Sequence, residues 1–164
     1  MSLLQFNDRI FVAGARGMAG GAIVRALEQA GYGQSAEDGV LLTPSRGELD
    51  LLSSQAVNNW FEANKPTVVV LAAATVGGIQ ANTTRPADFL LQNLQIETNV
   101  IETAWRHGVR RLLFLGSSCI YPKFSEQPIR EESLLNGSLE PTNEWYAIAT
   151  VSYTHLTLPT TSPV

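Results

Sequence analysis

The residues best suited to proton-transfer chemistry lie in the last third of the sequence. Ser117 and Ser118 follow an apolar segment at 111–115, and Tyr146 comes about one helix length later. A tyrosine phenol beside a serine hydroxyl can hydrogen-bond to a carbonyl oxygen and protonate it. A cation four residues further on, one helical turn away, would help the phenol to release its proton, but Thr150 stands there. From the residue types alone, Tyr146 can be either a catalytic residue or an ordinary half-buried aromatic.

Cys119 is the only cysteine in the sequence. A lone cysteine is commonly a small apolar core residue, although beside a reactive carbonyl its thiolate could move protons. One cysteine cannot form an intrachain disulfide, which favours a reducing compartment, and we expect a cytoplasmic protein. Together with only two histidines it is too little for a metal cluster, so no metal site is expected.

A second candidate site is a glycine-rich loop between a predicted strand at 9–13 and a predicted helix at 18–30. Its members are Gly14, Ala15, Arg16, Gly17, Met18, Ala19 and Gly20. This is a variant of the dinucleotide fingerprint. Glycines let the backbone approach a pyrophosphate, and the helix start offers free N–H groups to the phosphates. The alternative is a tight turn without a ligand, but the position between a strand and a helix favours the dinucleotide.

The arginines near this loop indicate which dinucleotide is bound. NAD binders usually place a carboxylate at the end of the second strand, and the predicted strand at 40–43 has none there. Arg46 follows that strand, and Arg16 lies inside the glycine loop. Two guanidinium groups suit the 2′-phosphate of NADP, so NADP(H) is the predicted cofactor. The alternative is that both arginines are simply solvated.

The ends of the third and fourth predicted strands would complete the cofactor site, because ligands of such sheets lie beyond the C-terminal ends of the strands. The residues assigned there are Ala72, Ala73, Leu115, Gly116, Ser117 and Ser118. Small residues after the third strand would allow a ribose or nicotinamide to lie against the backbone. Tight packing without a ligand is the alternative for them.

The elements that must position these residues alternate between short apolar runs and amphipathic stretches. Strands are predicted at 9–13, 40–43, 67–73 and 111–115, and helices at 18–30, 53–65, 86–107 and from 144. This alternation predicts an α/β fold, a Rossmann-like doubly wound parallel sheet with helices on both faces, incomplete at its C-terminus. Along the 86–107 helix, residues at helical spacing are Leu90, Leu91, Leu94, Thr98 and Ile101.

The sequence divides near residue 150. Residues 1–149 are predicted to form one NADP-binding domain. From Thr150 onward the chain is rich in threonine and lacks helical periodicity, so we expect 150–164 to be a non-native or disordered tail. The net charge of −4 argues against a nucleic-acid partner. The longest apolar run, 68–74, is far too short to cross a membrane.

Four blocks of the sequence resemble the GDP-L-fucose synthase family, the NADP-dependent 3,5-epimerase/4-reductases of the extended short-chain dehydrogenase/reductase group. The blocks are 14–20, 72–79, 115–123 and 140–149. The resemblance implies a GDP-sugar substrate, GDP-4-keto-6-deoxy-mannose, which is epimerised at C3 and C5 and reduced by NADPH at C4, and it implies a homodimer. It assigns Tyr146 as proton donor to the C4 oxygen, Ser117 as its hydrogen-bond partner, and Cys119 as the acid/base group of epimerisation.

Two residues depart from the family pattern, which has lysine where Thr75 and Thr150 stand here. The family's later strands, its sugar-nucleotide domain and a histidine partner for Cys119 have no counterpart after residue 149. We therefore expect this chain to be inactive by itself. Two alternatives remain open, a nucleotide-sugar 4-epimerase or dehydratase-type reductase that retains NAD, and a non-catalytic dinucleotide-binding module.

Overall fold

The computed structural model describes residues 3–34 and 39–154, with side chains as far as 152. They divide into two compact modules. The sheet module comprises Met1–Ala74 and Ile96–Leu115, and the pocket module comprises Thr75–Gln95 and Gly116–Val164.

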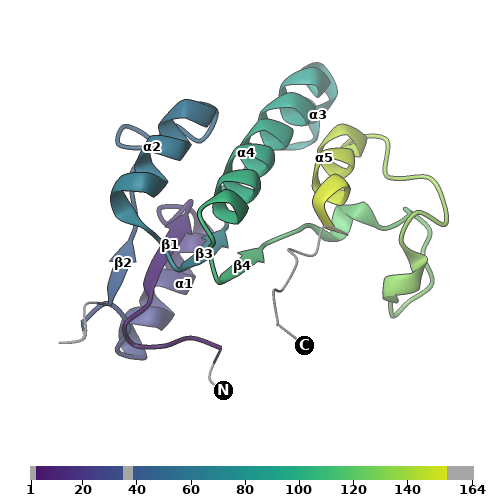
Figure 1. Cartoon of the computed structure of the whole chain (residues 1–164). Coiled ribbons are helices and arrows are strands. Elements are labelled where there is room, and N and C mark those ends of the chain that lie inside the picture. Colours follow the sequence, from purple (N-terminus) through teal and green to yellow (C-terminus); the bar gives the residue numbers. More distant parts are fainter. Residues whose placement is uncertain (1–2, 35–38, 155–164) are drawn as a thin grey trace. The chain divides into compact units, whose positions relative to one another are not determined.

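The sheet module contains a parallel sheet in the order β2-β1-β3-β4, as Figure 1 shows. The strands are β1 (Arg9–Ala13), β2 (Val40–Leu42), β3 (Val68–Leu71) and β4 (Arg111–Phe114). Every residue of β3 is buried, which accounts for its continuous β-branched run, because a parallel strand is covered on both faces. The predicted fold class is confirmed, and each observed strand lies within its predicted range.

Helices cover both faces of this sheet. The helix α1 (Met18–Gln29) packs Ile23, Val24 and Leu27 against a core that contains Ile10 and Val12 of β1. The residue between those two, Phe11, points the other way and meets the rings of Trp60 and Phe61 on α2 (Ser54–Asn64), with centroids 4.5 and 5.7 Å apart. Alternation along one strand therefore separates the two layers of helices.

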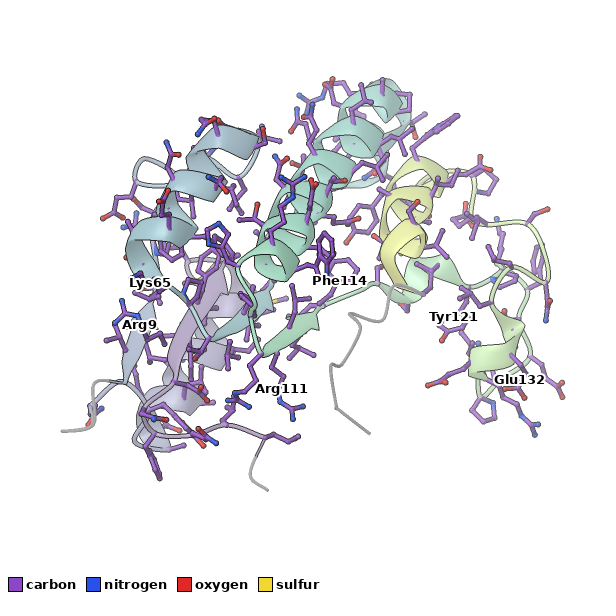
Figure 2. The ribbon with its side chains drawn as sticks, viewed as in Figure 1. Arg9, Lys65, Arg111, Phe114, Tyr121 and Glu132 are labelled. Carbon is purple, nitrogen blue, oxygen red and sulfur yellow. The ribbon has the colours of Figure 1, made fainter. Side chains whose placement is uncertain are left out.

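The ends of these helices follow local rules of capping. The Ser53 hydroxyl accepts a hydrogen bond from the Ala56 N–H (3.2 Å) and starts α2. Lys65, labelled at the other end in Figure 2, takes a left-handed conformation with φ of 46° just before Pro66. Gly31 follows α1 with φ of 87°, a value that favours glycine.

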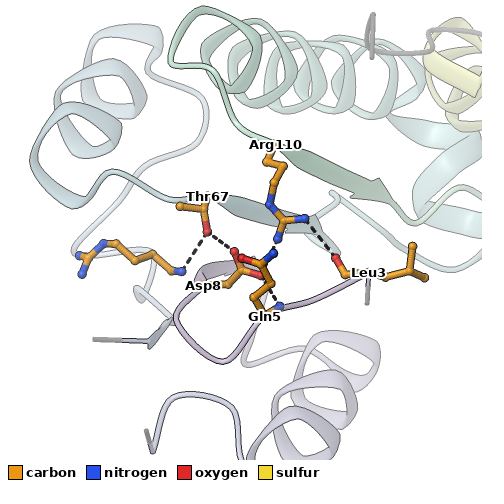
Figure 3. A network of polar contacts seen from close by, with 6 residues as sticks. Leu3, Gln5, Asp8, Thr67 and Arg110 are labelled. Atoms are coloured by element: carbon orange, nitrogen blue, oxygen red, sulfur yellow. Dashed lines mark hydrogen bonds and ion pairs between the residues drawn. The ribbon is translucent and has the colours of Figure 1, made fainter. Parts of the chain in front are cut away.

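A polar network ties together the residues that precede three strands (Figure 3). Asp8, before β1, accepts hydrogen bonds from the Thr67 hydroxyl (2.8 Å) and the Gln5 N–H (2.7 Å), and it pairs with Arg110 at 2.6 Å. Burial by itself would raise the pKa of Asp8, but the hydrogen bonds from Arg110, Gln5 and Thr67 together outweigh it and hold the pKa below its ordinary value. Thr67 precedes β3 and Arg110 precedes β4, so one carboxylate fixes three strand starts. Arg9 and Arg111, labelled in Figure 2, begin β1 and β4 next to it.

The remaining helices are shared with, or belong to, the pocket module. They are α3 (Ile79–Thr84), the long α4 (Pro86–Arg106), which continues into the sheet module, α5 (Glu144–Thr154), and the short 3-10 turns η1 (Ser118–Ile120) and η2 (Glu131–Ser133). Sequence analysis did not predict α3 or the two turns. All three are three to six residues long, which is too short to show a helical period.

The structure corrects the predicted face of α4. Leu91 is 56% exposed and Thr98 is also exposed, so the residues chosen by spacing do not form the buried stripe. Of the residues chosen by spacing, only Ile101 is buried, and the full set of buried positions is Phe89, Asn93, Ile96, Glu97, Val100, Ile101, Thr103 and Ala104. Apolar residues occur on more than one side of this helix, while three polar residues (Asn93, Glu97 and Thr103) lie inside its buried stripe. Periodicity of apolar residues alone therefore selects the wrong face.

The structure also corrects the predicted loss of helical structure at Thr150. The helix α5 continues to Thr154. The Thr150 hydroxyl donates to the Tyr146 carbonyl (3.1 Å) and the Ser152 hydroxyl to the Ile148 carbonyl (2.8 Å), so both polar side chains are satisfied within the helix. Positions 155–164 of the predicted tail lie outside the described residues, and its non-native origin stays a prediction.

The described residues form neither a membrane-spanning helix nor a cluster of metal-binding side chains. None of their helices combines the length and the apolar character that crossing a bilayer requires. In the same part of the chain, no group of three or more His, Cys, Asp or Glu side chains is arranged to hold a metal ion.

Candidate active site and coenzyme loop

The glycine loop of the sheet module connects β1 to α1 in a form that only glycine fits. Gly14 has φ of 82°, and a Cβ there would lie 2.8 Å from the carbonyl carbon and oxygen of Ala72. A Cβ on Gly20 would overlap the Gly14 carbonyl. The loop is therefore pressed against the backbone that follows β3. This places the predicted residues Ala72 and Ala73 directly beside it.

The start of α1 suits an anion. Gly17 precedes the helix and provides no side-chain cap, and the first turn carries no acidic residue. Met18 is 94% exposed, so its side chain does not cover this end. Backbone N–H groups at such a helix start, together with the helix dipole, attract phosphate groups. The residues present therefore fit the diphosphate of a dinucleotide.

The loop after β2 contains a carboxylate that the strand-end pattern missed. Glu48 accepts hydrogen bonds from the Ser45 hydroxyl (2.6 Å) and the Ser45 N–H (2.7 Å). These bonds are the main cause that lowers the pKa of Glu48, and the positive charge of Arg16 lowers it further. Arg16 and Arg46 are both exposed. The predicted arginines thus share this region of the sheet module with an acid, which also interacts with Arg16.

The pocket module brings together two of the three predicted catalytic residues. Cys119 and Tyr146 line one pocket of about 180 Å³. The other residues of its wall are Val76, Gly77, Ile79, Asn82, Thr142 and Asn143. Ser117 is not among the described wall residues, but its hydroxyl accepts a hydrogen bond from the Cys119 N–H (3.2 Å) and so fixes the turn η1 that carries the cysteine.

Two asparagines of this pocket were missed by the sequence analysis. The Asn143 amide donates to the Cys119 sulfur at 3.1 Å, and the Asn82 amide donates to the carbonyls of Gly77 and Gly78 at 2.8 and 3.1 Å. Asn143 belongs to the 140–149 block that carried the family resemblance, which was a usable signal. For Asn82 the sequence offers none, because only the fold brings α3 to the cysteine.

The two positions where the family has lysine are both held by hydrogen bonds here. The Asn93 side chain makes two hydrogen bonds to the backbone of Thr75: it accepts from the Thr75 N–H (2.7 Å) and donates to the Thr75 carbonyl (3.0 Å). The Thr75 hydroxyl also bonds to Gln92 (3.0 Å). Thr150 is 2% exposed and lies one helical turn after Tyr146 on α5. Its methyl group lies close to Gly116, where an added Cβ would be 3.7 Å away.

The family follows from comparison with known proteins. Residues 10–161 match the model of the NAD dependent epimerase/dehydratase family, so the chain belongs to that family. Within it the chain is similar to GDP-L-fucose synthases, as the resemblance predicted. It is 57% identical to GDP-L-fucose synthase 1 of Arabidopsis thaliana over 92% of this chain and 45% of that protein. It is 54% identical to GDP-L-fucose synthase of Escherichia coli K12 over 89% of this chain and 44% of that protein. The chain thus spans less than half the length of these relatives.

Solved structures agree with these relatives. A GDP-L-fucose synthetase from Naegleria fowleri bound to NADP superposes with a TM-score of 0.79 at 29% identity, over 91% of this chain and 43% of that chain. The protein DdhaC superposes with a TM-score of 0.85 at 46% identity, over 91% of this chain and 41% of that chain. The described chain therefore shares its fold with a GDP-L-fucose synthetase whose structure contains NADP.

Proposed function

We propose that this chain is the coenzyme-binding part of a GDP-L-fucose synthase and carries its Ser117, Cys119 and Tyr146. The proposed reaction converts GDP-4-keto-6-deoxy-mannose to GDP-L-fucose by epimerisation at C3 and C5 and reduction at C4. The single observation that supports it most is the common pocket of Cys119 and Tyr146, in a chain 54% identical to the Escherichia coli enzyme. A homodimer and a cytoplasmic location remain predictions.

Cys119 and Tyr146 would divide the proton transfers between them. The C4 ketone acidifies the hydrogens on C3 and C5, so a thiolate at Cys119 can remove such a proton. The histidine that the family pairs with Cys119, which belongs to the C-terminal part of the enzyme, would then return a proton to the other face of the carbon. NADPH, when bound, supplies the hydride that reduces C4. Tyr146 gives its phenolic proton to the C4 oxygen as that bond forms, which completes the hydroxyl group, and Ser117 hydrogen-bonds the same oxygen.

The coenzyme would lie on the sheet module. The N–H groups from Gly14 to Gly20 hold the diphosphate, and Arg16 and Arg46 hold the 2′-phosphate. On this module, the strand-end residues proposed to line the rest of the site are Ala72, Ala73 and Leu115. Gly116, Ser117 and Ser118, which were also predicted to contact the coenzyme, belong to the pocket module, and their contact stays a prediction. Since Arg16 also interacts with Glu48, the 2′-phosphate must compete with that carboxylate for the guanidinium.

Glu48 supports one alternative function, that of an NAD-dependent enzyme. A carboxylate after the second strand is the group that holds the ribose 2′-hydroxyl in NAD enzymes, so an NAD-retaining nucleotide-sugar 4-epimerase is the alternative. Titration of the chain with NADPH and with NADH, followed by nicotinamide fluorescence, separates the two. We expect tighter binding of NADPH, loss of this preference in Arg16→Ala and Arg46→Ala, and no change in the exposed control Arg106→Ala. Equal affinities for the two coenzymes would exclude the arginine site and favour the epimerase.

The catalytic part is tested by a fusion protein. Residues 1–149 are joined to the C-terminal part of the Escherichia coli synthase, once with lysine and once with threonine at position 150. We expect NADPH-dependent formation of GDP-L-fucose from the lysine form, and roughly 100-fold less from the threonine form, since Tyr146 then lacks its cation. A folded lysine form that binds NADPH and gives no turnover would disprove the assignment.

A further inference from the structure

Asn82 lines the pocket of Cys119 and Tyr146, and no donor among the described residues satisfies its Oδ1 atom. Asn82 is 8% exposed, and both hydrogens of its amide group are used by the carbonyls of Gly77 and Gly78. These two bonds fix the orientation of the amide, because turning it over would set Oδ1 against two carbonyl oxygens. Oδ1 is buried, and no donor within the described residues reaches it.

Asn143 presents a second acceptor of the same kind. It immediately precedes α5, where an asparagine oxygen ordinarily caps the first turn. Here its amide nitrogen donates to the Cys119 sulfur at 3.1 Å, and its buried Oδ1 has no donor among the described residues. The Asn143 side chain therefore contacts the Cys119 sulfur and does not cap the first turn of α5.

The backbone that presents Asn143 is held from two sides. The Asn143 N–H donates to the Glu140 carbonyl (3.1 Å), and the Asn143 carbonyl accepts from the Ala147 N–H (3.0 Å). Glu140 in turn pairs with Lys123 at 2.7 Å and accepts hydrogen bonds from Thr142. The position of the amide beside the cysteine is thus built into the turn before α5.

We propose that Asn143 positions Cys119 and stabilises its thiolate, and that the Oδ1 atoms of Asn143 and Asn82 accept hydrogen bonds from the two ring hydroxyls of the keto-sugar. Identification of the sugar rests on the proposed function. An N–H donor favours the thiolate over the thiol, and the thiolate is the form that removes a proton. Buried acceptors require donors, and the proposed sugar has free hydroxyls only at C2 and C3.

The arrangement gives Asn143 two linked tasks. One amide group contacts the thiolate through its nitrogen and a ring hydroxyl through its oxygen. The carbon that bears this hydroxyl is thereby brought next to the sulfur, as proton removal from C3 requires. Asn82 contacts the ring only, so its removal affects binding of the sugar and leaves the thiolate unchanged.

The positioning role is tested on this chain without any turnover, since Cys119 is its only cysteine. The rate of iodoacetamide alkylation is measured against pH. We expect the curve of Asn143→Ala to move to higher pH by roughly 0.3 to 1 pH unit, a twofold to tenfold loss of thiolate at neutral pH. Asn143→Asp has nearly the same shape but no donor, and should move the curve further. Asn82→Ala and the exposed control Asn136→Ala should not move it. Unmoved curves in both Asn143 variants would overturn this role.

The sugar contacts are tested in the fusion protein with lysine at position 150. Incorporation of solvent deuterium at C3 and C5, without NADPH, isolates the proton transfers from reduction. We expect Asn143→Ala to slow incorporation at saturating sugar, Asn82→Ala to raise the KM about tenfold with kcat nearly unchanged, and Asn136→Ala to change neither. Normal incorporation and KM in both pocket variants would overturn the inference alone. Absence of incorporation and reduction in the parent fusion would overturn the proposed function, while the alkylation curves would still decide the positioning role.

Discussion

Buried polar groups are treated differently in the two modules. At the strand starts of the sheet module, Asp8 receives hydrogen bonds from Thr67, Gln5 and Arg110, and both of its oxygens are used. In the pocket module, Asn82 and Asn143 use their nitrogens within the chain and leave their oxygens without a donor among the described residues. The closed network serves the stability of the fold. The open acceptors lower stability, and in our proposal the sugar hydroxyls are their missing donors.

The sheet module also contains a buried carboxyl group that, unlike Asp8, has an oxygen without a hydrogen-bond donor among the described residues. Glu97 on α4 is 4% exposed, and its Oε2 has no donor in the described part of the chain. Burial raises the pKa of Glu97 to about 8. Asp8 and Glu97 therefore differ in the sign of their pKa shift because one is partnered and the other is not.

The largest expected effect is that of breaking the closed network with Asp8→Ala. The substitution leaves the Thr67 hydroxyl, the Gln5 N–H and Arg110 without their acceptor, and we expect a loss of about 3 kcal/mol in the free energy of unfolding. Urea unfolding at pH 7 measures it. Because the pKa of Asp8 is lowered, its contribution is present above the unfolded value of 3.8 and is lost as the pH falls through the folded value. The difference between the two proteins should therefore shrink in acid.

The control for this variant is Glu102→Ala. Glu102 pairs with Arg106 at 2.6 Å on the exposed side of α4, and such a pair contributes less than about 0.5 kcal/mol. If Asp8→Ala costs no more than this control, the network does not stabilise the strand starts.

Glu97→Gln should change the pH dependence of stability. Between the unfolded pKa near 4.5 and the folded pKa of about 8, the folded carboxyl keeps a proton that the unfolded chain has lost. Stability from this group is therefore full below the unfolded pKa and falls as the pH rises. We expect the free energy of unfolding of the parent chain to decrease by about 2 kcal/mol from pH 6 to pH 8, with no such contribution from this position in the variant. Parallel curves from urea unfolding at several pH values would show that Glu97 is ionised in the folded chain.

Gly14→Ala tests the tight contact of the glycine loop. The φ of 82° and the 2.8 Å approach to the Ala72 backbone both oppose a side chain, and we expect a loss of about 1.5 kcal/mol together with weaker NADPH binding. Thermal unfolding and coenzyme titration measure the two effects. Gly47→Ala is the matched control, since the nearest atom to its added Cβ is 3.9 Å away. An unchanged melting temperature in Gly14→Ala would show that the loop can relax.

Most of the fold could be predicted from the sequence because its signals are local. The buried run of β3, the cap at Ser53 and the proline after Lys65 each act within a few residues, and their elements lie within or close to the predicted ranges. The face of α4 could not be predicted in this way. Its buried stripe contains Asn93 and Glu97, whose burial depends on partners or surroundings that only the folded chain supplies.

The part of the candidate site that lies in one continuous motif could be predicted from the sequence. The part that the fold assembles from separate segments could not. The glycine loop is one continuous segment, and its contact with Ala72 follows from the pairing of β1 with β3. The pocket instead joins α3, η1 and the start of α5. Tyr146 was singled out by its residue type and spacing, and the role of Cys119 came from the family resemblance. Asn82 instead depends on a six-residue helix without a detectable period.

The smallest expected effect compares two asparagines within the pocket module. Asn93 is fully bonded, to the Thr75 N–H and carbonyl and to the Phe89 carbonyl, so Asn93→Ala should cost about 2 kcal/mol. Asn143→Ala removes one hydrogen bond to the Cys119 sulfur and also removes an oxygen that has no donor among the described residues, and these changes oppose each other. We expect a change of less than about 1 kcal/mol in the free energy of unfolding. Equal losses in the two variants would mean that Asn143 is held for stability, and the contrast between closed and open polar groups would then fail at the pocket itself.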